Sequence, residues 1–443
     1  MNRPVRVLIP CNPAQSTGKA TVSATVQRRP SPAEVCNASS WGKALTQDLT
    51  GLDNAAATRF ASGQLHIAIV ARALSHDFGG VREYVESLIG ELIGMGTPHR
   101  YTIYYSDRRL IGRFPIASEV AITAPHKLIW DHCLLPLRLR RDRPDVAWFP
   151  QNNISLGINC PTVVSVTDML YFSIPEFPRR EYAWADTLYG RISMPRSLRQ
   201  AARIMAISDH TAYDIRRLIG IDAGKIRTIH LAPAARYRRL TAAECAPTRQ
   251  KYNLRRPFFF YAGVLSPRKN VRVLIDAFGK IAGEIEHDLV LTGGSCSLEV
   301  PFTDLVKRYD IQGRIHRLGK VDADELVALY NLADAFVFPS LYEGFGIPPL
   351  EAFACGCPVI SSAATSLREV VGDAALIFNP EDPDTLAAHM RAVVTNQALR
   401  ERLVKDGLER VSRFSYRRAA RELLTLLEEA ARWPTLTTSR PRQ

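Results

Sequence analysis

Two glutamates, Glu343 and Glu351, are the residues in this chain whose surroundings best suit chemistry. A short apolar strand predicted at 335–338 runs into a turn-rich loop that holds Glu343. The next helix is predicted to open at Pro348-Pro349, because proline fits the first turn of a helix. Carboxylates accept hydrogen bonds from sugar hydroxyls, and the unpaired N–H groups at a helix start favour negative charge. The block therefore predicts a site for a polyhydroxylated, phosphorylated ligand; two solvated glutamates beside an ordinary loop are the alternative.

Arg268 and Lys269 form a second candidate group. They lie in the sequence LSPRKN, just before Asn270, which is predicted to cap a helix that begins at residue 271. An arginine can bind two phosphate oxygens at once, and a lysine acts as a compact charge. We therefore predict that this pair clamps a diphosphate, with a solvated basic loop as the alternative.

Two further candidates follow predicted strands in the first half of the chain. Gly79-Gly80 connects a strand to a helix, and glycine lets a ligand approach the backbone closely. Thr167 and Asp168 follow the buried strand predicted at 162–166. Ligands of parallel sheets gather beyond the carboxyl ends of the strands, so both positions are candidates for ligand binding.

Other motifs are better explained as structure. Asp322 and Glu325 fit a capping box at a helix start, which accounts for the D-x-D sequence there without a metal. The eight cysteines are scattered, and the spacing of Cys355 and Cys357 suits neither a zinc site nor a disulfide framework. We therefore expect reduced packing residues and no metal. Ser16 to Lys19 resembles the end of a phosphate-binding loop but lacks the leading glycine.

Size and charge set the broad class of the protein. Its 443 residues exceed the size at which single cores stop growing, so two domains are expected. A net charge of +13 favours anionic partners: phospholipid, a diphosphate-linked acceptor or, least expected because no nucleic-acid-binding motif is present, nucleic acid. No apolar run reaches the roughly 18 residues that span a bilayer, and the first apolar run is too short for a signal peptide. We expect a cytoplasmic location, with any contact to the inner face of the membrane being peripheral.

Predicted strands alternate with predicted helices, which implies an α/β fold with parallel sheets covered on both faces. The expected order is a disordered extension at 1–63, an amino-terminal domain at 64–240, a linker at 241–257, a carboxyl-terminal domain at 258–415, a helix at 416–432 and a tail at 433–443. Both domains would be doubly wound and Rossmann-like, with their strand ends facing a common cleft. The last helix is amphipathic, and we expect it to pack on the amino-terminal domain rather than on a membrane.

The spacing of Glu343 and Glu351, with the flanking GFG and the trailing GCPV, resembles the donor-site signature of retaining glycosyltransferases of the GT-B fold, family 4. The resemblance covers nearly all of 65–432. GVLSPRKN, LTGG, RLGKVDADEL and PVISSAATSLREVVGD look like the carboxyl-terminal domain of these enzymes, whereas VVSVTDM and AISDHTAYDI match the amino-terminal domain more loosely. The chain is most similar to bacterial enzymes that move mannose from GDP-mannose in polysaccharide or lipopolysaccharide assembly.

The resemblance implies a role for each candidate residue. Arg268 and Lys269 would stabilise the charge on the departing nucleoside diphosphate, so that neither a metal nor another cofactor is needed. Glu343 would hold hydroxyls of the donor sugar, and Glu351 would accept from those of ribose. Further donor contacts would come from the Gly79-Gly80 loop, from the backbone near Val321 beside the base, and from the backbone N–H groups of Phe345, Gly346 and Ile347. No residue is an obvious nucleophile, as the family's front-face retaining mechanism implies.

One position departs from the family pattern. Many relatives have His-Asp where this chain has Thr167 followed by Asp168. A threonine hydroxyl can hydrogen-bond a sugar oxygen but cannot carry a positive charge. Either Thr167 substitutes in part, another residue such as His210 acts, or the chemistry is weakened.

The sequence leaves three functions open. The first is a retaining mannosyltransferase that uses GDP-mannose and a lipid-linked or glycan acceptor. The second is a nucleotide-sugar epimerase of the same fold, which would need a set of acid and base side chains that the sequence does not reveal. The third is a non-catalytic partner subunit, which Thr167 favours and the joint presence of Lys269, Glu343 and Glu351 disfavours.

Overall fold

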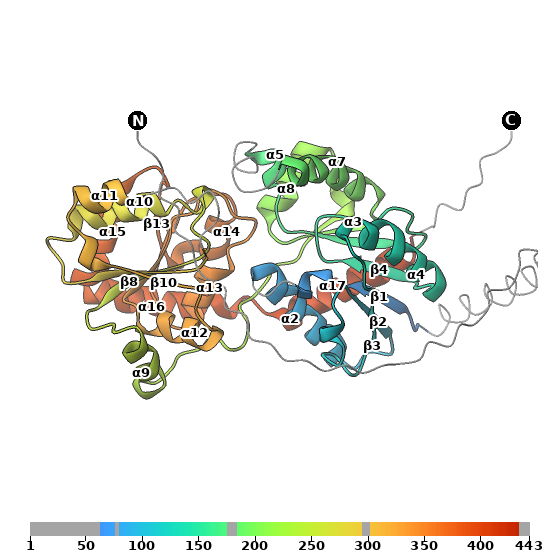
Figure 1. Cartoon of the computed structure of the whole chain (residues 1–443), viewed down its shortest axis with the longest axis horizontal. Helices are drawn as coiled ribbons and strands as arrows, with labels where there is room; N and C mark the ends of the chain where they lie inside the picture. The colour runs from blue at the N-terminus through green and yellow to red at the C-terminus, as the bar shows by residue number, and fades with distance from the viewer. Residues whose placement is uncertain (1–62, 76–78, 175–183, 295–301, 434–443) are drawn as a thin grey trace, which may run out of the picture. The chain divides into compact units, whose positions relative to one another are not determined.

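A computed structural model describes residues 63–75, 79–174, 184–294 and 302–433. In these ranges the chain forms two lobes, each built on a fully parallel sheet (Figure 1). The predicted α/β class with two doubly wound domains is confirmed. Nearly all of the predicted extension and tail, including Ser16 to Lys19, lies outside the described residues.

The amino-terminal lobe holds a seven-stranded sheet in the order β3-β2-β1-β4-β5-β6-β7. Its strands are β1 (His66–Val70), β2 (Arg100–Tyr105), β3 (Ser118–Ala121), β4 (Val146–Phe149), β5 (Thr162–Val166), β6 (Arg203–Ala206) and β7 (Ile226–Thr228). Its helices are α2 (Gly80–Gly94), α3 (Lys127–Ile129), the π-helical turn η3 (Trp130–Leu134), α4 (Leu135–Asp142), α5 (Leu170–Ser173), α7 (Trp184–Gln200) and α8 (Asp209–Ile219), with short 3-10 turns η1 (Arg72–Ser75), η2 (Arg108–Leu110) and η4 (Ala223–Lys225). The strand order reverses between β1 and β4, where such sheets bind ligands.

The carboxyl-terminal lobe holds a six-stranded sheet in the order β10-β9-β8-β11-β12-β13. Its strands are β8 (Phe258–Ala262), β9 (Asp288–Thr292), β10 (Ile315–Gly319), β11 (Ala335–Phe338), β12 (Val359–Ser362) and β13 (Leu376–Phe378). Its helices are α9 (Ala242–Lys251), α10 (Val271–Ile281), α11 (Thr303–Arg308), α12 (Ala323–Leu332), α13 (Ile347–Ala354), α14 (Leu367–Val371), α15 (Pro383–Thr395) and α16 (Gln397–Ser412), with turns η5 (Pro267–Lys269), η6 (Gln312–Arg314) and η7 (Gly372–Ala374). Here the strand order reverses between β8 and β11.

Both faces of each sheet are buried at its central strands, which explains why strands such as β1, β4, β8 and β11 are continuous apolar runs. In β1, Ile67 and Ile69 belong to one hydrophobic cluster, and Ala68 and Val70 belong to another on the opposite face. Alternate side chains of one strand point to opposite faces of the sheet, so β1 contributes to two hydrophobic cores. This double burial fixes the register of the strands, and with it the loops at their carboxyl ends.

Two local predictions are corrected by the structure. Asn270 does precede α10, but it has a left-handed backbone (φ 53°), and its side-chain amide donates to the carbonyl of Pro380 rather than capping the helix. The segment 241–257, which was predicted to be a linker, contains α9. Thr241 and Glu244 form a capping box at the start of this helix. The capping box predicted at Asp322 is confirmed, since the Glu325 carboxylate accepts from the Asp322 N–H at 3.2 Å.

The terminal helix α17 (Tyr416–Ala431) packs on the amino-terminal lobe, as predicted. It lies against α2 and against β4, β5 and β6, and Figure 1 shows the red helix among the blue and green elements of that lobe. Leu423 and Leu427 are fully buried there, and the carboxylate of Glu429 pairs with Arg227 at 2.9 Å. The chain thus returns to its first lobe after completing the second.

Candidate active site

A buried carboxylate and two cations meet at the strand reversal of the carboxyl-terminal lobe. Lys269 and Arg268 lie on the loop after β8, and Glu343 lies on the loop after β11, the neighbouring strand. Lys269 Nζ is 2.6 Å from Glu343 Oε1, and Arg268 Nη1 is 3.4 Å from the same oxygen. The side chains of Lys269 and Glu343 are each only 12% exposed. The sequence-predicted cation pair and the first glutamate therefore form one cluster.

Glu343 is held in its ionised form by these neighbours. Burial alone would raise the pKa of the Glu343 carboxyl, but Lys269 and Arg268 outweigh burial and leave the pKa below its ordinary value. Lys269 also lies over the ring of Phe338, with Nζ 4.8 Å from the ring centroid. The cluster is a buried arrangement of paired charges rather than a solvated basic loop.

The loop 340–346 that carries Glu343 is fixed through its backbone. Arg268 Nη1 donates to the carbonyl of Tyr342 at 2.9 Å, and Thr365 Oγ1 accepts from the Glu343 N–H at 2.9 Å. Ser366 Oγ lies 2.9 Å from the Glu343 carbonyl and 2.8 Å from that of Phe345. A carboxylate on such a loop keeps its position without help from a ligand.

Gly344 brings this loop against the amino-terminal lobe. A Cβ at this position would lie 1.7 Å from the carbonyl oxygen of Thr167, so no other residue fits. The carbonyl of Gly344 accepts hydrogen bonds from the hydroxyls of Ser208, at 2.7 Å, and Thr211, at 3.2 Å. The N–H of Met169 donates to the hydroxyl of Tyr342 at 3.0 Å. The two lobes therefore touch at the loop that positions Glu343.

Thr167 and Asp168 lie at this contact, at the carboxyl end of β5. Both the N–H and the hydroxyl of Thr167 donate to the side-chain oxygen of Asn152, at 2.8 and 3.1 Å. Burial raises the pKa of Asp168, while its backbone partner Leu170 and Arg268 oppose that rise. His210, the other candidate for this role, lies with its ring 6.3 Å from that of Tyr342 and its Nε2 3.5 Å from Asp214. It lines neither pocket described below.

Glu351 lines a separate space, which we call the interlobe pocket. It has a volume of about 570 Å³, and residues from both lobes line it. Five of the predicted binding residues take part: Gly79, Gly80, Val321, Ile347 and Glu351. A Cβ on Gly80 would lie 3.9 Å from Cδ1 of Ile347, so the glycine loop faces the start of α13.

Phe345 and Gly346 lie outside the lining of the interlobe pocket. Phe345 is buried with its ring 5.9 Å from that of His230, so its side chain serves packing. Gly346 has φ 108° and precedes α13, whose first turn holds Pro348 and Pro349, as predicted. The role predicted for these two residues concerns their N–H groups and stays a prediction.

Glu351 has partners that the sequence did not indicate. Its carboxyl accepts from the hydroxyl of Tyr330 at 2.8 Å, and Tyr237 is a second neighbour. Arg236 pairs with Glu83 at 2.5 Å across the same pocket. Burial, with Glu83 adding to it, raises the pKa of Glu351 to about 8, although the hydrogen bonds from Tyr330 and Tyr237 act in the opposite direction. Arg236 and Tyr237 come from an aperiodic stretch, so their basic and aromatic character was the only available signal.

A second space, the polar pocket, lies at the reversal point of the amino-terminal sheet. It has a volume of about 180 Å³ and is lined from the ends of β1, β4 and β5 and from α3, η3 and α7. Arg72 pairs with Asp131 at 3.2 Å, and the hydroxyl of Tyr189 lies 2.9 Å from Nε2 of His132. Lys127 Nζ lies 5.6 Å from the centre of the Tyr189 ring. Paired charges beside an aromatic ring suit a hydroxylated ligand, and Thr167 lines this pocket too.

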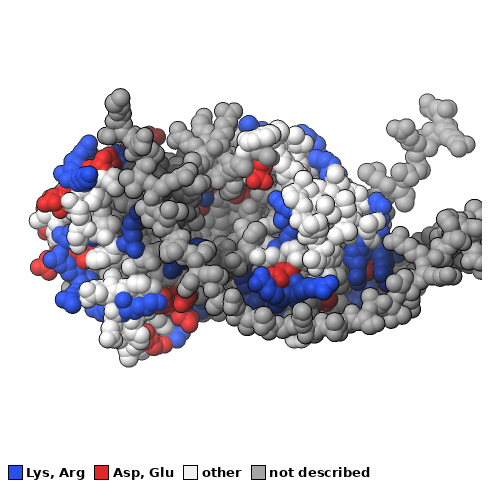
Figure 2. Space-filling model, in the orientation of Figure 1, with Lys and Arg blue, Asp and Glu red and all other residues white. Residues whose placement is uncertain are grey.

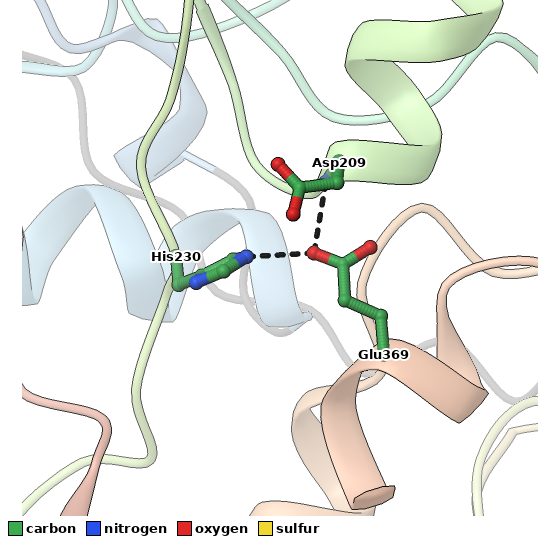
Figure 3. Close-up of side chains that lie close together, drawn as sticks. All are labelled: Asp209, His230 and Glu369. Atoms are coloured by element: carbon green, nitrogen blue, oxygen red, sulfur yellow. Dashed lines mark hydrogen bonds and ion pairs between the residues drawn. The ribbon is translucent and has the colours of Figure 1, made fainter.

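Three side chains meet at another junction between the lobes (Figure 3). The carboxylate of Glu369, on α14, accepts from the N–H groups of Asp209 and His210 at 2.8 and 3.1 Å and from His230 Nε2 at 2.6 Å. Glu369, His230 and the carboxylate of Asp209 offer metal-ligand atoms within 4.8 Å of one another. The start of α8 is electropositive, however, and Glu369 already accepts from it. We therefore interpret the group as a helix cap between lobes rather than a cation site.

Two family models match the chain, one in each lobe. Glycosyltransferase Family 4 matches residues 78–232, and Glycosyl transferases group 1 matches residues 246–410.

Curated relatives include several mannosyltransferases. O-antigen chain mannosyltransferase B of Escherichia coli is 37% identical over 257 residues, which are 57% of this chain and 66% of that protein. Serotype-specific mannosyltransferase WbdA of Escherichia coli is 31% identical over 50% of this chain and 28% of its own length. O-antigen chain mannosyltransferase RfbU of Salmonella typhimurium is 26% identical over 49% of this chain and 57% of its own length. The chain thus matches less than two thirds of the length of each.

Solved structures share the fold. Alr3699/HepE of Anabaena, in complex with UDP and glucose, has a TM-score of 0.66 at 16% identity, over 82% of this chain and 99% of its own. Sucrose-phosphate synthase of Thermosynechococcus elongatus has a TM-score of 0.64 at 20% identity, over 82% of this chain and 98% of its own. At such identities the likeness shows a common architecture and no more. Among the described residues, every helix is too short or too polar to cross a bilayer.

Replacing Gly344 with alanine tests the contact between the lobes. Its Cβ would overlap the Thr167 carbonyl, so we expect Gly344→Ala to lower the free energy of unfolding by about 1–3 kcal/mol. Urea denaturation measures the change. Gly90→Ala is the matched control, because a Cβ at Gly90 meets nothing within 4 Å. An unfolding curve of Gly344→Ala that overlays the native one would contradict the close approach.

Replacing Glu351 with glutamine tests its raised pKa. The folded state holds the proton of Glu351 up to about pH 8, whereas the unfolded chain releases it near pH 4.5. Its contribution to stability is therefore fully present below pH 4.5 and declines as the pH rises toward 8, by at most about 1.4 kcal/mol per pH unit.

Glutamine cannot ionise, so we expect Glu351→Gln to lose stability less steeply than the native protein over this range. Urea denaturation at several pH values measures both slopes. The exposed substitution Glu286→Gln is the control and should follow the native slope. Parallel slopes for Glu351→Gln and the native protein would show that Glu351 is ionised in the fold.

Proposed function

Since this chain belongs to the GT-B glycosyltransferases, we propose that it transfers a mannosyl residue, with retention, from a nucleotide sugar to a glycan acceptor in O-antigen synthesis. The reaction class is supported by three relatives whose names describe O-antigen or serotype-specific mannosyltransferases. GDP-mannose is the favoured donor. The observation that carries the proposal is the cluster of Lys269, Arg268 and Glu343 at the strand reversal of the carboxyl-terminal lobe.

Leaving-group charge is the main barrier in such a reaction. The bond from the anomeric carbon to the diphosphate breaks, a bond to the acceptor oxygen forms, and the acceptor proton passes to a departing phosphate oxygen. Lys269 and Arg268 would meet the charge that develops on the diphosphate. Ser266, two residues before Arg268, has a buried hydroxyl without a hydrogen-bond partner among the described residues, so it is available to a phosphate oxygen. Glu343, ionised by the same cations, would hold hydroxyls of the mannose.

The nucleoside would occupy the interlobe pocket. Its volume of about 570 Å³ falls within the range of small-molecule sites. Glu351 would bind the ribose hydroxyls, Val321 would border the base, and Gly79-Gly80 would leave room for the diphosphate. No metal is proposed, because Lys269 and Arg268 would supply the positive charge at the diphosphate that a metal ion would otherwise supply.

The acceptor would enter from the polar pocket. Thr167 lines that pocket, and its carbonyl lies against Gly344, the residue that follows Glu343. A lipid-linked glycan and a peripheral position on the inner face of a membrane would fit the proposed pathway.

A donor screen tests the choice of nucleotide sugar. Ligand at a hundredfold excess over its Kd stabilises the folded state by about 2.7 kcal/mol. We expect GDP-mannose with EDTA to raise the thermal unfolding midpoint more than UDP-glucose does. A larger rise of the unfolding midpoint with UDP-sugars would show that the donor is a UDP-sugar rather than GDP-mannose. No rise with any nucleotide sugar would favour a non-catalytic subunit.

Substituting the charge cluster tests the catalytic assignment. Lys269→Met should lower the transfer rate at least about 100-fold, as loss of a transition-state donor does. Glu343→Gln should lower the rate as well, because a carboxylate accepts hydrogen bonds at both oxygens, whereas an amide has one acceptor oxygen and one donor nitrogen. Transfer of radiolabelled mannose to the glycan acceptor measures the rate.

The double variant Lys269→Met/Glu343→Gln separates folding from catalysis. Each single substitution leaves a buried charge with fewer partners, whereas the double variant removes both charges at similar volume. We expect it to unfold at a temperature nearer to that of the native protein than Lys269→Met does, and to remain inactive. Native-like transfer by any of the three variants would refute the assignment.

A further inference from the structure

Helix α7 exposes an apolar stripe. Trp184 is 78% exposed, Leu188 50% and Ile192 65%. These residues are spaced by four, so they lie along one face of the helix. Large apolar side chains on the outer face of a surface helix usually indicate that something else contacts them.

The stripe continues beside the polar pocket. Leu128 and Ile129 on α3 and Leu156 on the loop after β4 are each more than 40% exposed. Their chain neighbours Lys127, Asp131 and His132 line the pocket, as do Tyr189 and Gly190 of α7. The Leu156 N–H donates to His132 Nδ1 at 3.1 Å, and His132 contacts Tyr189. The six apolar residues therefore flank one polar pocket, and we call them the apolar rim: Leu128, Ile129, Leu156, Trp184, Leu188 and Ile192.

Positive charge surrounds the apolar rim. The segments 127–142 and 184–200 contain seven Lys and Arg against three Asp, and two of those Asp, Asp131 and Asp142, pair with Arg72 and Arg138. Arg140, Arg141 and Arg199 are exposed. Figure 2 shows white, uncharged surface where Figure 1 places α7 and α3, with blue side chains at its margins. Apolar side chains ringed by cations suit an anionic lipid surface.

Two other occupants are disfavoured by charge. A second copy that used the same face would set one basic surface against another, since a two-fold interface pairs a patch with itself. The residues 1–62 carry seven Lys and Arg against three acidic residues, so they too are repelled.

We propose that the apolar rim docks onto an anionic bilayer and holds the polar pocket at the headgroup level, where a glycan on a lipid carrier would meet it. This inference rests on the proposed glycan transfer for the role of the pocket, but the docking itself does not depend on any reaction. The rim enters the interface, and the flanking arginines bind lipid phosphates.

Vesicle co-sedimentation of the full chain tests the docking. We expect binding to vesicles of phosphatidylglycerol and phosphatidylethanolamine, weaker binding to neutral phosphatidylcholine, and release at high salt. Leu188→Ser/Ile192→Ser should weaken binding to the anionic vesicles at least about tenfold, because two apolar side chains no longer enter the interface. The matched control is Ile111→Ser/Ile116→Ser, which removes two exposed isoleucines outside the rim and should bind like the native protein.

A charge variant and a donor readout complete the test. Arg141→Glu/Arg199→Glu should lose binding to anionic vesicles and leave the thermal shift by GDP-mannose unchanged. Equal vesicle binding by the native protein and the rim variant, or dimerisation of the native protein that the rim variant abolishes, would overturn the docking proposal. If GDP-mannose does not raise the unfolding midpoint of the native protein, that result would count against the proposed function. It would not affect the interpretation of vesicle binding.

Discussion

The ion cluster at Glu343 is the interaction on which the rest of the site depends. A carboxylate that is 12% exposed is costly to ionise unless cations stand beside it. Lys269 and Arg268 lie 74 residues or more away in sequence, and they reach Glu343 only because β8 and β11 are neighbours. The reversal of strand order between these two strands opens their loops to the same crevice. The topology of the sheet is therefore a condition of the charge cluster, and the cluster in turn sets the protonation of Glu343.

The second constraint is the backbone contact between lobes. The Thr167 carbonyl approaches Gly344 so closely that only hydrogen fits on its Cα, and the hydroxyls of Ser208 and Thr211 hold the Gly344 carbonyl. Glu369 adds a second contact of the same kind, since it accepts from two N–H groups at the start of α8. Most of these contacts are hydrogen bonds to backbone, which depend on geometry more than on buried area. The loop with Glu343 is thereby positioned by both lobes.

Much of this arrangement could be predicted from the sequence. The strands at 162–166 and 335–338 were predicted with the bounds that the structure has, because each is a short apolar run closed by turn residues. The loop holding Glu343 followed from the strand at 335–338 and from the proline-started helix, and the position of Lys269 followed from the helix predicted to begin at residue 271. The edge strands of the amino-terminal sheet were missed: β3 is half exposed, and β7 has three residues with little pattern.

Other features depend on contacts distant in sequence. The left-handed backbone of Asn270 places its amide on Pro380, a partner 110 residues away that no local pattern reveals. Burial and Glu83, which is 268 residues away in sequence, raise the pKa of Glu351, so this shift could not be anticipated from a local pattern. Thr167 is uncharged, so the charges around Glu343 come from other side chains, and their balance is visible only in the structure. Lys269 and Arg268 stand against Glu343 and Asp168, two cations against two acids. Burial raises the pKa of Asp168 and Glu343 adds to the rise, while Leu170 and Arg268 oppose it, whereas the pKa of Glu343 is lowered, so the two acids respond differently to the same cations.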